Sequence, residues 1–196
     1  ATEDRVLAIF AVADTIKESS REAITDLHRL GVTSVMLTGD NVATATSIAR
    51  LAGIDDARGN LLPEDKLAAI EELQERHGPT AMTGDGINDA PALARADIGV
   101  AMGAAGTDTA MEAADVVIMN DDLRRIPETI RLSRQTHAVL WQNIALALGI
   151  KVVFLGLAVF GNATMWMAVF ADMGASLLVV ANGLRTLRTS APQTRD

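Results

Sequence analysis

The stretch MTGDGINDAPALARADIGVAMG at residues 82–103 decides the fold class, because it sets a glycine-rich loop between a strand and a helix. The pattern predicts a strand at residues 80–82, a loop at 83–89, a short helix at 88–95 and a second strand at 98–102. In parallel α/β sheets, loops that follow a strand and precede a helix carry the ligand-binding residues. The stretch therefore predicts an α/β domain with its site at the carboxyl ends of the strands.

The alternation of strands and helices continues on both sides of this stretch. Further strands are expected at residues 6–13, 34–37 and 116–119, where short apolar runs end in polar residues. Helices are expected between the upstream strands, at residues 19–30, 42–51 and 63–77. This order predicts a doubly wound parallel sheet.

Two loops have the form Thr-Gly-Asp, at residues 38–40 and 83–85. Glycine permits sharp turns, and the exposed backbone N–H groups at the start of the following helix can hold an anion. Asp and Asn oxygens suit Mg²⁺, and Lys66 is a mobile positive charge suited to a phosphoryl group. The order T-G-D-N, P-E-D-K and T-G-D-G-I-N-D argues against ordinary helix caps and favours phosphate chemistry.

Composition excludes several classes of function. The chain has 196 residues, a net charge of −8, no cysteine and 3% aromatic residues. A nucleic-acid partner is not expected, because a basic footprint and stacking aromatics are missing. The lack of cysteine excludes a disulfide scaffold, a thiolate nucleophile and a cysteine metal site within these residues.

The charges are unevenly distributed, which indicates a membrane segment. Residues 135–184 carry two formal charges, Lys151 and Asp172. Residues 138–161 and 165–184 are each apolar and long enough to cross a bilayer, and a tight polar turn separates them. Arginines outside both ends predict a transmembrane hairpin of the cell membrane with both ends in the cytoplasm. The sequence before residue 15 has no signal-peptide pattern.

Lys151 and Asp172 are expected at the same depth in the membrane. With the turn after Asn162, they lie about 17 and 14 Å from it at the rise of an α-helix. A lone charge near the bilayer centre costs at least ~2.5 kcal/mol. The two residues either form an ion pair that joins two helices, or form a transport site with Asp172 as the cation ligand and Lys151 as its counter-ion. Gly149, Gly156 and Gly174 are candidates for close helix approach.

The segments LTGDN, LLPEDK and MTGDGINDAPALARADIGVAMG resemble the second half of the phosphorylation domain of P-type ATPases, members of the haloacid-dehalogenase-like superfamily. The resemblance includes VADTIKESSREAI upstream and TDTAMEAADVVIM downstream. It implies an ATP-driven cycle through an aspartyl phosphate, with Mg²⁺ and ATP as cofactors. The resemblance implies that Thr38, Gly39, Asp40 and Lys66 bind the phosphoryl group and the nucleotide. It implies that Asp85 binds Mg²⁺. Asn88 and Asp89 would shape the same site, with Asp89 as a further Mg²⁺ ligand.

One element of the family is missing from the sequence. The D-K-T-G-T motif that carries the nucleophile does not occur, and Asp14 in VADTI is interpreted as a structural residue at a strand end. We expect a C-terminal fragment of a larger pump that needs the N-terminal part as its partner and does not hydrolyse ATP alone. Its expected divisions are the phosphorylation domain at residues 1–122, a basic helix at 123–137, the hairpin at 138–184 and a cytoplasmic tail at 185–196.

The membrane residues suggest a branch of the family. A lysine in the first helix and ADMGAS at residues 171–176 in the second resemble exporters of zinc, cadmium and lead, so a divalent heavy-metal ion is the expected cargo. Met165, Met167 and Met173 leave a copper-type pump open as a second hypothesis. Two further hypotheses are a membrane-anchored phosphatase of the same superfamily and a non-catalytic membrane module.

Overall fold

The computed structural model describes residues 16–84, 89–103, 112–161 and 164–189. The chain divides into two compact units, Ala1–Pro127 and Glu128–Asp196, and each is described by itself. The strand expected at residues 6–13 and Asp14 lie outside the described residues.

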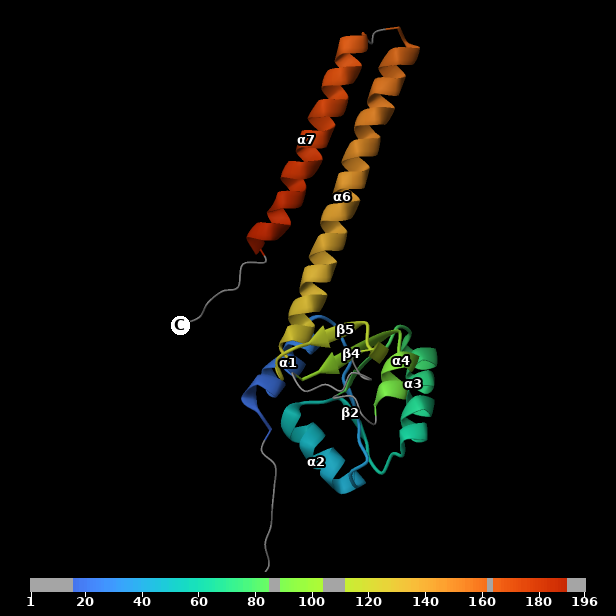
Figure 1. Cartoon of the computed structure of the whole chain (residues 1–196), viewed down its shortest axis with the longest axis vertical. Helices are drawn as coiled ribbons and strands as arrows, with labels where there is room; N and C mark the ends of the chain where they lie inside the picture. The colour runs from blue at the N-terminus through green and yellow to red at the C-terminus, as the bar shows by residue number, and fades with distance from the viewer. Residues whose placement is uncertain (1–15, 85–88, 104–111, 162–163, 190–196) are drawn as a thin grey trace, which may run out of the picture. The chain divides into compact units, whose positions relative to one another are not determined.

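The first unit alternates helices with short strands (Figure 1). Asn41 caps one helix by accepting a hydrogen bond from the Thr44 N–H at 2.8 Å, and Pro63 occupies the first turn of another. The elements in chain order are α1 (Glu18–Arg29), β1 (Val35–Leu37), α2 (Val42–Ala52), β2 (Asp56–Arg58), α3 (Pro63–His77), β3 (Ala81–Gly84), α4 (Ala90–Arg95), β4 (Ile98–Met102) and β5 (Val116–Ile118).

All strand pairs among the described residues are parallel, which confirms the expected α/β class. Strand β1 pairs with β2, and β3, β4 and β5 form a sheet in that order. Two differences from the sequence prediction stand out. The described strands form two sheets rather than one, and β2 was not predicted, because Asp-Ala-Arg contains no apolar run.

One aspartate at the start of each parallel pair fixes the strand register. The N–H of Asp97 donates to the Thr80 carbonyl at 3.0 Å, and its carboxylate accepts the Thr80 N–H at 2.8 Å. The same reciprocal pair joins Asp115 to Gly99 and Asp55 to Ser34. Each aspartate therefore satisfies both backbone groups of a residue on the neighbouring strand segment, just before the first residue pair of that ladder.

The core of the first unit is built around β4, which is buried on both faces. On one face, Leu93 of α4 packs with Ala101, and both side chains are 1% exposed. On the other face, Val100 and Met102 pack with Ile118. The central strand therefore holds helix α4 in position.

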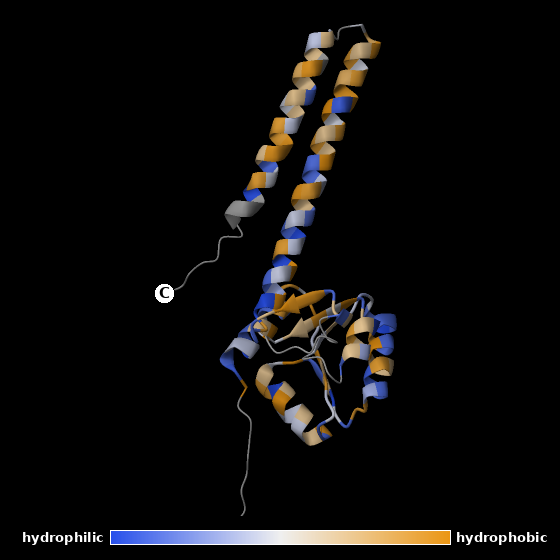
Figure 2. Cartoon of the chain, in the orientation of Figure 1, coloured by the Kyte–Doolittle hydropathy of each residue, from blue (hydrophilic) through white to orange (hydrophobic). Residues whose placement is uncertain are grey.

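The second unit contains most of α6 (Arg125–Val159) together with α7 (Met165–Thr189). Both helices are long and apolar enough to cross a membrane, by length and composition. Figure 2 shows hydrophobic residues over most of both helices, and these side chains are largely exposed. Such a surface is stable in lipid rather than in water.

Candidate functional site

The first Thr-Gly-Asp loop is held in place by the loop that follows β2. The Thr38 N–H donates to the Arg58 carbonyl at 3.0 Å, and the Leu61 N–H donates to the Thr38 carbonyl at 3.1 Å. The Asn60 N–H donates to the Asp40 carbonyl at 2.6 Å. Gly59 permits this close packing, because a Cβ there would lie 2.8 Å from the Asp40 carbonyl oxygen.

The side chains of this loop turn toward each other. The Thr38 hydroxyl donates to Asp40 Oδ2 at 3.1 Å and accepts from the Asp40 N–H at 3.1 Å. Gly39 between them lies next to the Leu61 carbonyl, 3.4 Å from where a Cβ would be. The Asp40 side chain is exposed, so its carboxylate remains accessible to a ligand.

Helix α3 carries Lys66, and an ion pair fixes this helix to β2. Arg58 donates to both carboxylate oxygens of Glu72, at 2.8 and 3.4 Å. The hydrogen bond from Arg58 lowers the pKa of Glu72, and the hydrogen bond to Glu72 raises the pKa of Arg58. Helix α3 begins at Pro63, directly after the segment from Arg58 to Leu61 that holds Thr38. Lys66 therefore follows that segment closely along the chain.

Lys66 also reaches the end of the second Thr-Gly-Asp loop. Its ammonium donates to Asp89 Oδ1 at 2.6 Å, and both side chains are only 15% exposed. Gly84 makes room for Asp89, because a Cβ on Gly84 would lie 2.8 Å from Asp89 Oδ2. Lys66 therefore links the second loop to α3, the helix that follows the residues holding the first loop.

Two of the predicted site residues, Asp85 and Asn88, lie outside the described residues. Among the residues that the structure describes, no three His, Cys, Asp or Glu side chains gather as a metal site. Asp89 contributes oxygen ligands of the type that Mg²⁺ prefers, and so would Asp85. As a ligand, Asp89 would share its carboxylate between Mg²⁺ and the ammonium of Lys66.

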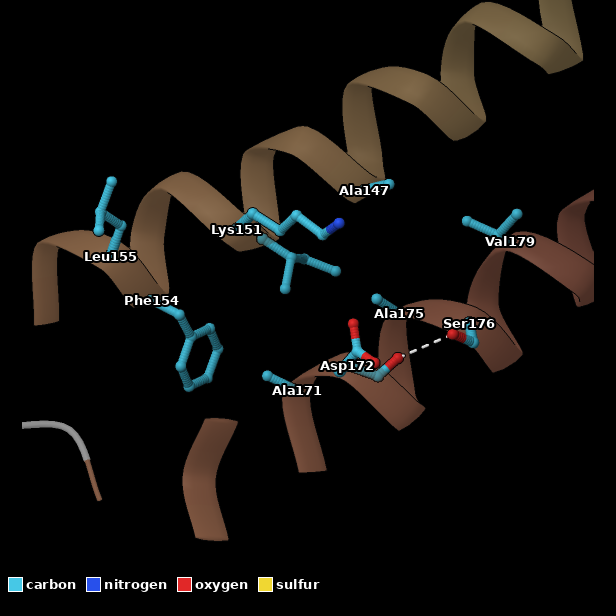
Figure 3. Close-up of a pocket in the computed structure, with 10 residues that line it drawn as sticks. Ala147, Lys151, Phe154, Leu155, Ala171, Asp172, Ala175, Ser176 and Val179 are labelled. Carbon is cyan, nitrogen blue, oxygen red and sulfur yellow. Dashed lines mark hydrogen bonds between the residues drawn. The ribbon is translucent and has the colours of Figure 1, made fainter. Parts of the chain in front are cut away.

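A cavity of about 550 Å³ lies between α6 and α7 within the second unit. Lys151 from α6 and Asp172 from α7 both line it, together with Ser176 and mostly apolar side chains (Figure 3). The Ser176 hydroxyl donates to the Asp172 carbonyl at 2.9 Å. In the described part of the chain, no ion pair within 4.0 Å links Lys151 to Asp172, so the two charges share a cavity without direct contact.

The glycines of the helices do not act as predicted within this unit. A Cβ built on Gly149, Gly156 or Gly174 would meet no atom of the described chain within 4 Å. Close approach of α6 to α7 at these glycines is therefore absent among the described residues. Open space at the glycines leaves the alanines and larger side chains to form the contact between the helices.

Sequence reasoning missed the residues that position the site. Arg58, Glu72 and Gly59 were not singled out, although they hold α3 and the first loop. The Gly-Asn pair directly before the LLPEDK segment is the signal that was available for Gly59. Nothing in the sequence indicates the Arg58–Glu72 pair, because its members lie 14 positions apart on different elements.

Comparisons with known proteins agree with this architecture. Residues 1–97 match the haloacid dehalogenase-like hydrolase family. A probable cadmium-transporting ATPase of Alkalihalophilus pseudofirmus is 50% identical over 188 residues, which is 95% of this chain and 26% of that protein. The zinc/cadmium/lead-transporting P-type ATPase of Escherichia coli is 49% identical over 185 residues, 94% of this chain and 25% of that protein.

A solved structure extends the match to three dimensions. The crystal structure of a zinc-transporting PIB-type ATPase in its E2.Pi state has a TM-score of 0.82 and 48% identity, and covers 89% of this chain and 28% of that one. Over most of its length, the chain is therefore similar to P-type ATPases whose names specify transport of zinc, cadmium or lead. It spans about a quarter of the length of these P-type ATPases.

Proposed function

We propose that this chain is the part of an ATP-driven heavy-metal exporter that handles the phosphoryl group and supplies two helices of the metal passage. The cargo is a divalent ion such as Zn²⁺, Cd²⁺ or Pb²⁺. The observation that carries the proposal is the cavity between two apolar helices in which Lys151 and Asp172 both lie. The matching ATPases support the choice of metal, because their names specify zinc, cadmium and lead transport.

The phosphoryl chemistry runs through an aspartyl phosphate. A carboxylate oxygen attacks the γ-phosphorus of ATP, ADP leaves, and water later hydrolyses the acyl phosphate. The D-K-T-G-T motif that would supply this carboxylate is not in the sequence, so another segment of the complete protein provides it. Thr38, Gly39 and Asp40 orient the phosphoryl group and the nucleotide in this proposal.

Lys66 stabilises the charge of the transferred phosphoryl group. Its ammonium is mostly buried and already fixed by Asp89, so little reorganisation is needed when the phosphoryl group arrives. Asp85 and Asp89 would hold Mg²⁺, with Asn88 beside them. An Mg²⁺ ion held by these residues would supply positive charge that stabilises the transferred phosphoryl group.

Asp172 binds the metal ion and Lys151 serves as the built-in counter-ion. An unpaired carboxylate inside a bilayer is costly, and a nearby ammonium compensates it when no metal ion is bound. The separation of the two charges across the cavity suits this exchange, because a direct ion pair would have to be broken at each cycle. Apart from Ser176, the other side chains that line the cavity are apolar, and apolar surroundings strengthen the interaction of a carboxylate with a cation.

We also propose that both ends of the two-helix segment face the cytoplasm. Arginines precede the apolar part of α6 at positions 124, 125, 131 and 134, and Arg185 follows that of α7. Positive charge of this kind marks the cytoplasmic side of membrane helices. The chain then divides into a phosphorylation domain at residues 1–122, a basic helix at 123–137, the hairpin at 138–184 and a tail.

Replacing Asp172 tests the proposal. In the complete protein that carries this segment, Asp172→Ala should abolish Zn²⁺-stimulated ATP hydrolysis, because the cavity loses its carboxylate. Leu177→Ala is the matched control, since Leu177 also lies on α7, is 72% exposed and does not line the cavity. Zn²⁺ stimulation that survives in Asp172→Ala at the level of the Leu177→Ala control would remove Asp172 from the metal passage.

A further inference from the structure

A second polar contact joins α6 to α7, away from the cavity. The Asn182 side-chain amide donates to Asn143 Oδ1 at 2.9 Å and to Gln142 Oε1 at 3.3 Å. The Asn182 Oδ1 atom accepts from Arg185 at 3.3 Å. Both the donor and the acceptor sides of Asn182 are therefore in use, so this cluster holds the two helices together and does not offer a free ligand site.

The contact lies in the seam between the helices. Leaving the glycines aside, the half-buried positions of α6 after residue 140 are 143, 147, 150, 154 and 157, and those described on α7 are 171, 175, 179 and 182. Spacings of three and four residues place each set on one helix face. Asn143 and Asn182 occupy seam positions, whereas the polar and apolar side chains that flank them on each helix are mostly exposed.

The rest of the seam does not define a unique register. Its members on α7 other than Asn182 are Ala171, Ala175 and Val179, which are small and similar to one another. A slide of α7 by one helical turn, about 5.4 Å, exchanges one small apolar side chain for another. The same slide would separate Asn182 from Asn143 and leave carboxamides without partners in lipid, which is costly. A single seam asparagine fixes register in coiled coils for the same reason.

We propose that the hydrogen bond between Asn143 and Asn182 sets the register of α6 against α7, and that Asn182 is a positioning residue for the metal passage. Asn143 precedes Lys151 by about 12 Å along α6, and Asn182 follows Asp172 by about 15 Å along α7, at the rise of an α-helix. Because the two offsets are similar, pairing of the asparagines brings the two charges to the same level. The effect of this register on metal transport rests on the proposed function of Asp172 and Lys151. The register itself does not depend on that function.

Disulfide trapping measures the register without metal or ATP. The segment has no cysteine of its own, so pairs can be introduced as Ala147→Cys with Ala175→Cys and as Ala147→Cys with Val179→Cys, one turn apart on α7. In membranes that contain the complete protein, the ratio of the two disulfide yields, mapped by mass spectrometry, should change about threefold or more when Asn182→Ala is added. Leu184→Ala is the matched control, because Leu184 is 54% exposed.

Metal activation provides the second measurement. The Zn²⁺ concentration for half-maximal ATPase stimulation should rise about 3- to 20-fold in Asn182→Ala, while maximal turnover changes little, because the ligands remain but are misplaced. Asn143→Ala should shift this concentration in the same direction but by no more than Asn182→Ala, because Asn182 keeps its hydrogen bond to Gln142, and the double variant should be no worse than Asn182→Ala. Alanine does not impair insertion of an apolar helix, so the variants remain testable.

The outcomes separate the two proposals. A disulfide ratio that is the same in the parent, in Asn182→Ala and in Leu184→Ala would overturn the register role. Additive effects of Asn143→Ala and Asn182→Ala on metal activation would also overturn it. If the disulfide ratio shifts while Asp172→Ala keeps full Zn²⁺ stimulation, the register role stands and the function proposed for Asp172 fails.

Discussion

A lysine is ion-paired in the α/β unit, whereas the lysine in the cavity of the helical unit is not paired with the aspartate across from it. In the α/β unit, Lys66 is 15% exposed and donates to Asp89 at 2.6 Å, so its position is fixed before any ligand arrives. In the helical unit, Lys151 and Asp172 line one cavity without an ion pair within 4.0 Å between them, as far as the described residues go. A fixed cation suits a phosphoryl group that always binds in the same place, and a separated pair suits a metal ion that must come and go.

The apolar side chains differ in the same way. Leu93 in the α/β unit is 1% exposed and packs in the core, whereas Leu177 of α7 is 72% exposed. Burial in the first case removes the side chain from water, which stabilises the fold. In the second case the side chain gains nothing from the chain itself and depends on lipid.

Among the substitutions that test this comparison of the two units, we expect the largest effect from replacing Lys66. Lys66→Ala should lower phosphoenzyme formation from ATP in the complete protein by about 10²- to 10³-fold, since it removes a pre-positioned charge. Lys17→Ala is the matched control, because Lys17 also pairs with an aspartate, Asp121, but at 64% exposure. Phosphoenzyme levels are measured by incorporation of label from ATP. Equal levels in the two variants would place Lys66 among structural ion pairs.

A smaller effect is expected for leucines in the two units. Leu93→Ala should lower the free energy of unfolding of the α/β unit by about 2–5 kcal/mol, because it leaves a cavity in the core. Leu177→Ala should leave the helical unit nearly unchanged in lipid. Hydrogen exchange of the β3–β5 amides reports the first unit, and fluorescence of Trp141 and Trp166, the two tryptophans of the chain, reports the second.

A large cost for Leu177→Ala would contradict the comparison, because it would mean that α7 buries this face against protein rather than lipid. A negligible cost for Leu93→Ala would contradict the assignment of the β4 core. Both measurements use the same substitution, so the atoms removed from the side chain are identical and only the surroundings differ.

The sequence predicted most of the fold because its signals were local. Strand β4 is found at the predicted residues, and α3 has the predicted bounds, because Pro63 and the acidic first turn mark its start. The apolar stretches of α6 and α7 were also visible, since bilayer-spanning length is a strong signal. Helix α2 extends one residue past its predicted end, to Ala52 before Gly53.

The residues that the sequence did not reveal act through contacts between distant segments. Strand β2 has no apolar pattern and exists because β1 and the Asp55–Ser34 pair align it. Asn182 was hidden among apolar residues, and its partner Asn143 lies 39 positions away. The repeated Ala-Asp before β4 and before β5 was the one local signal for the register aspartates.

The smallest predicted effect is on stability, from replacing one of these aspartates, Asp97. The Thr80 N–H and then the Gln74 amide donate to its carboxylate, and these hydrogen bonds hold the pKa of Asp97 below its usual range. A carboxyl whose pKa is lowered by folding binds fewer protons in the folded state than in the unfolded state. Its stabilisation is therefore complete above the usual aspartate pKa of about 3.9 and is lost as the pH falls through the lowered value.

Asp97→Asn isolates the contribution of the charge, because an asparagine oxygen can still accept the Thr80 N–H. At pH 7 the free energy of unfolding of Asp97→Asn should be lower than that of the parent, by a smaller amount than Leu93→Ala causes. This difference should shrink as the pH falls below 4. Asp97→Ala removes the acceptor as well, so it should remain less stable than Asp97→Asn at every pH. Urea unfolding followed by hydrogen exchange at β3 and β4 measures both. A parent-to-Asn difference that stays constant from pH 7 to pH 3 would show that the carboxylate charge does not fix this strand register, and that the α/β unit depends on hydrogen-bond geometry alone.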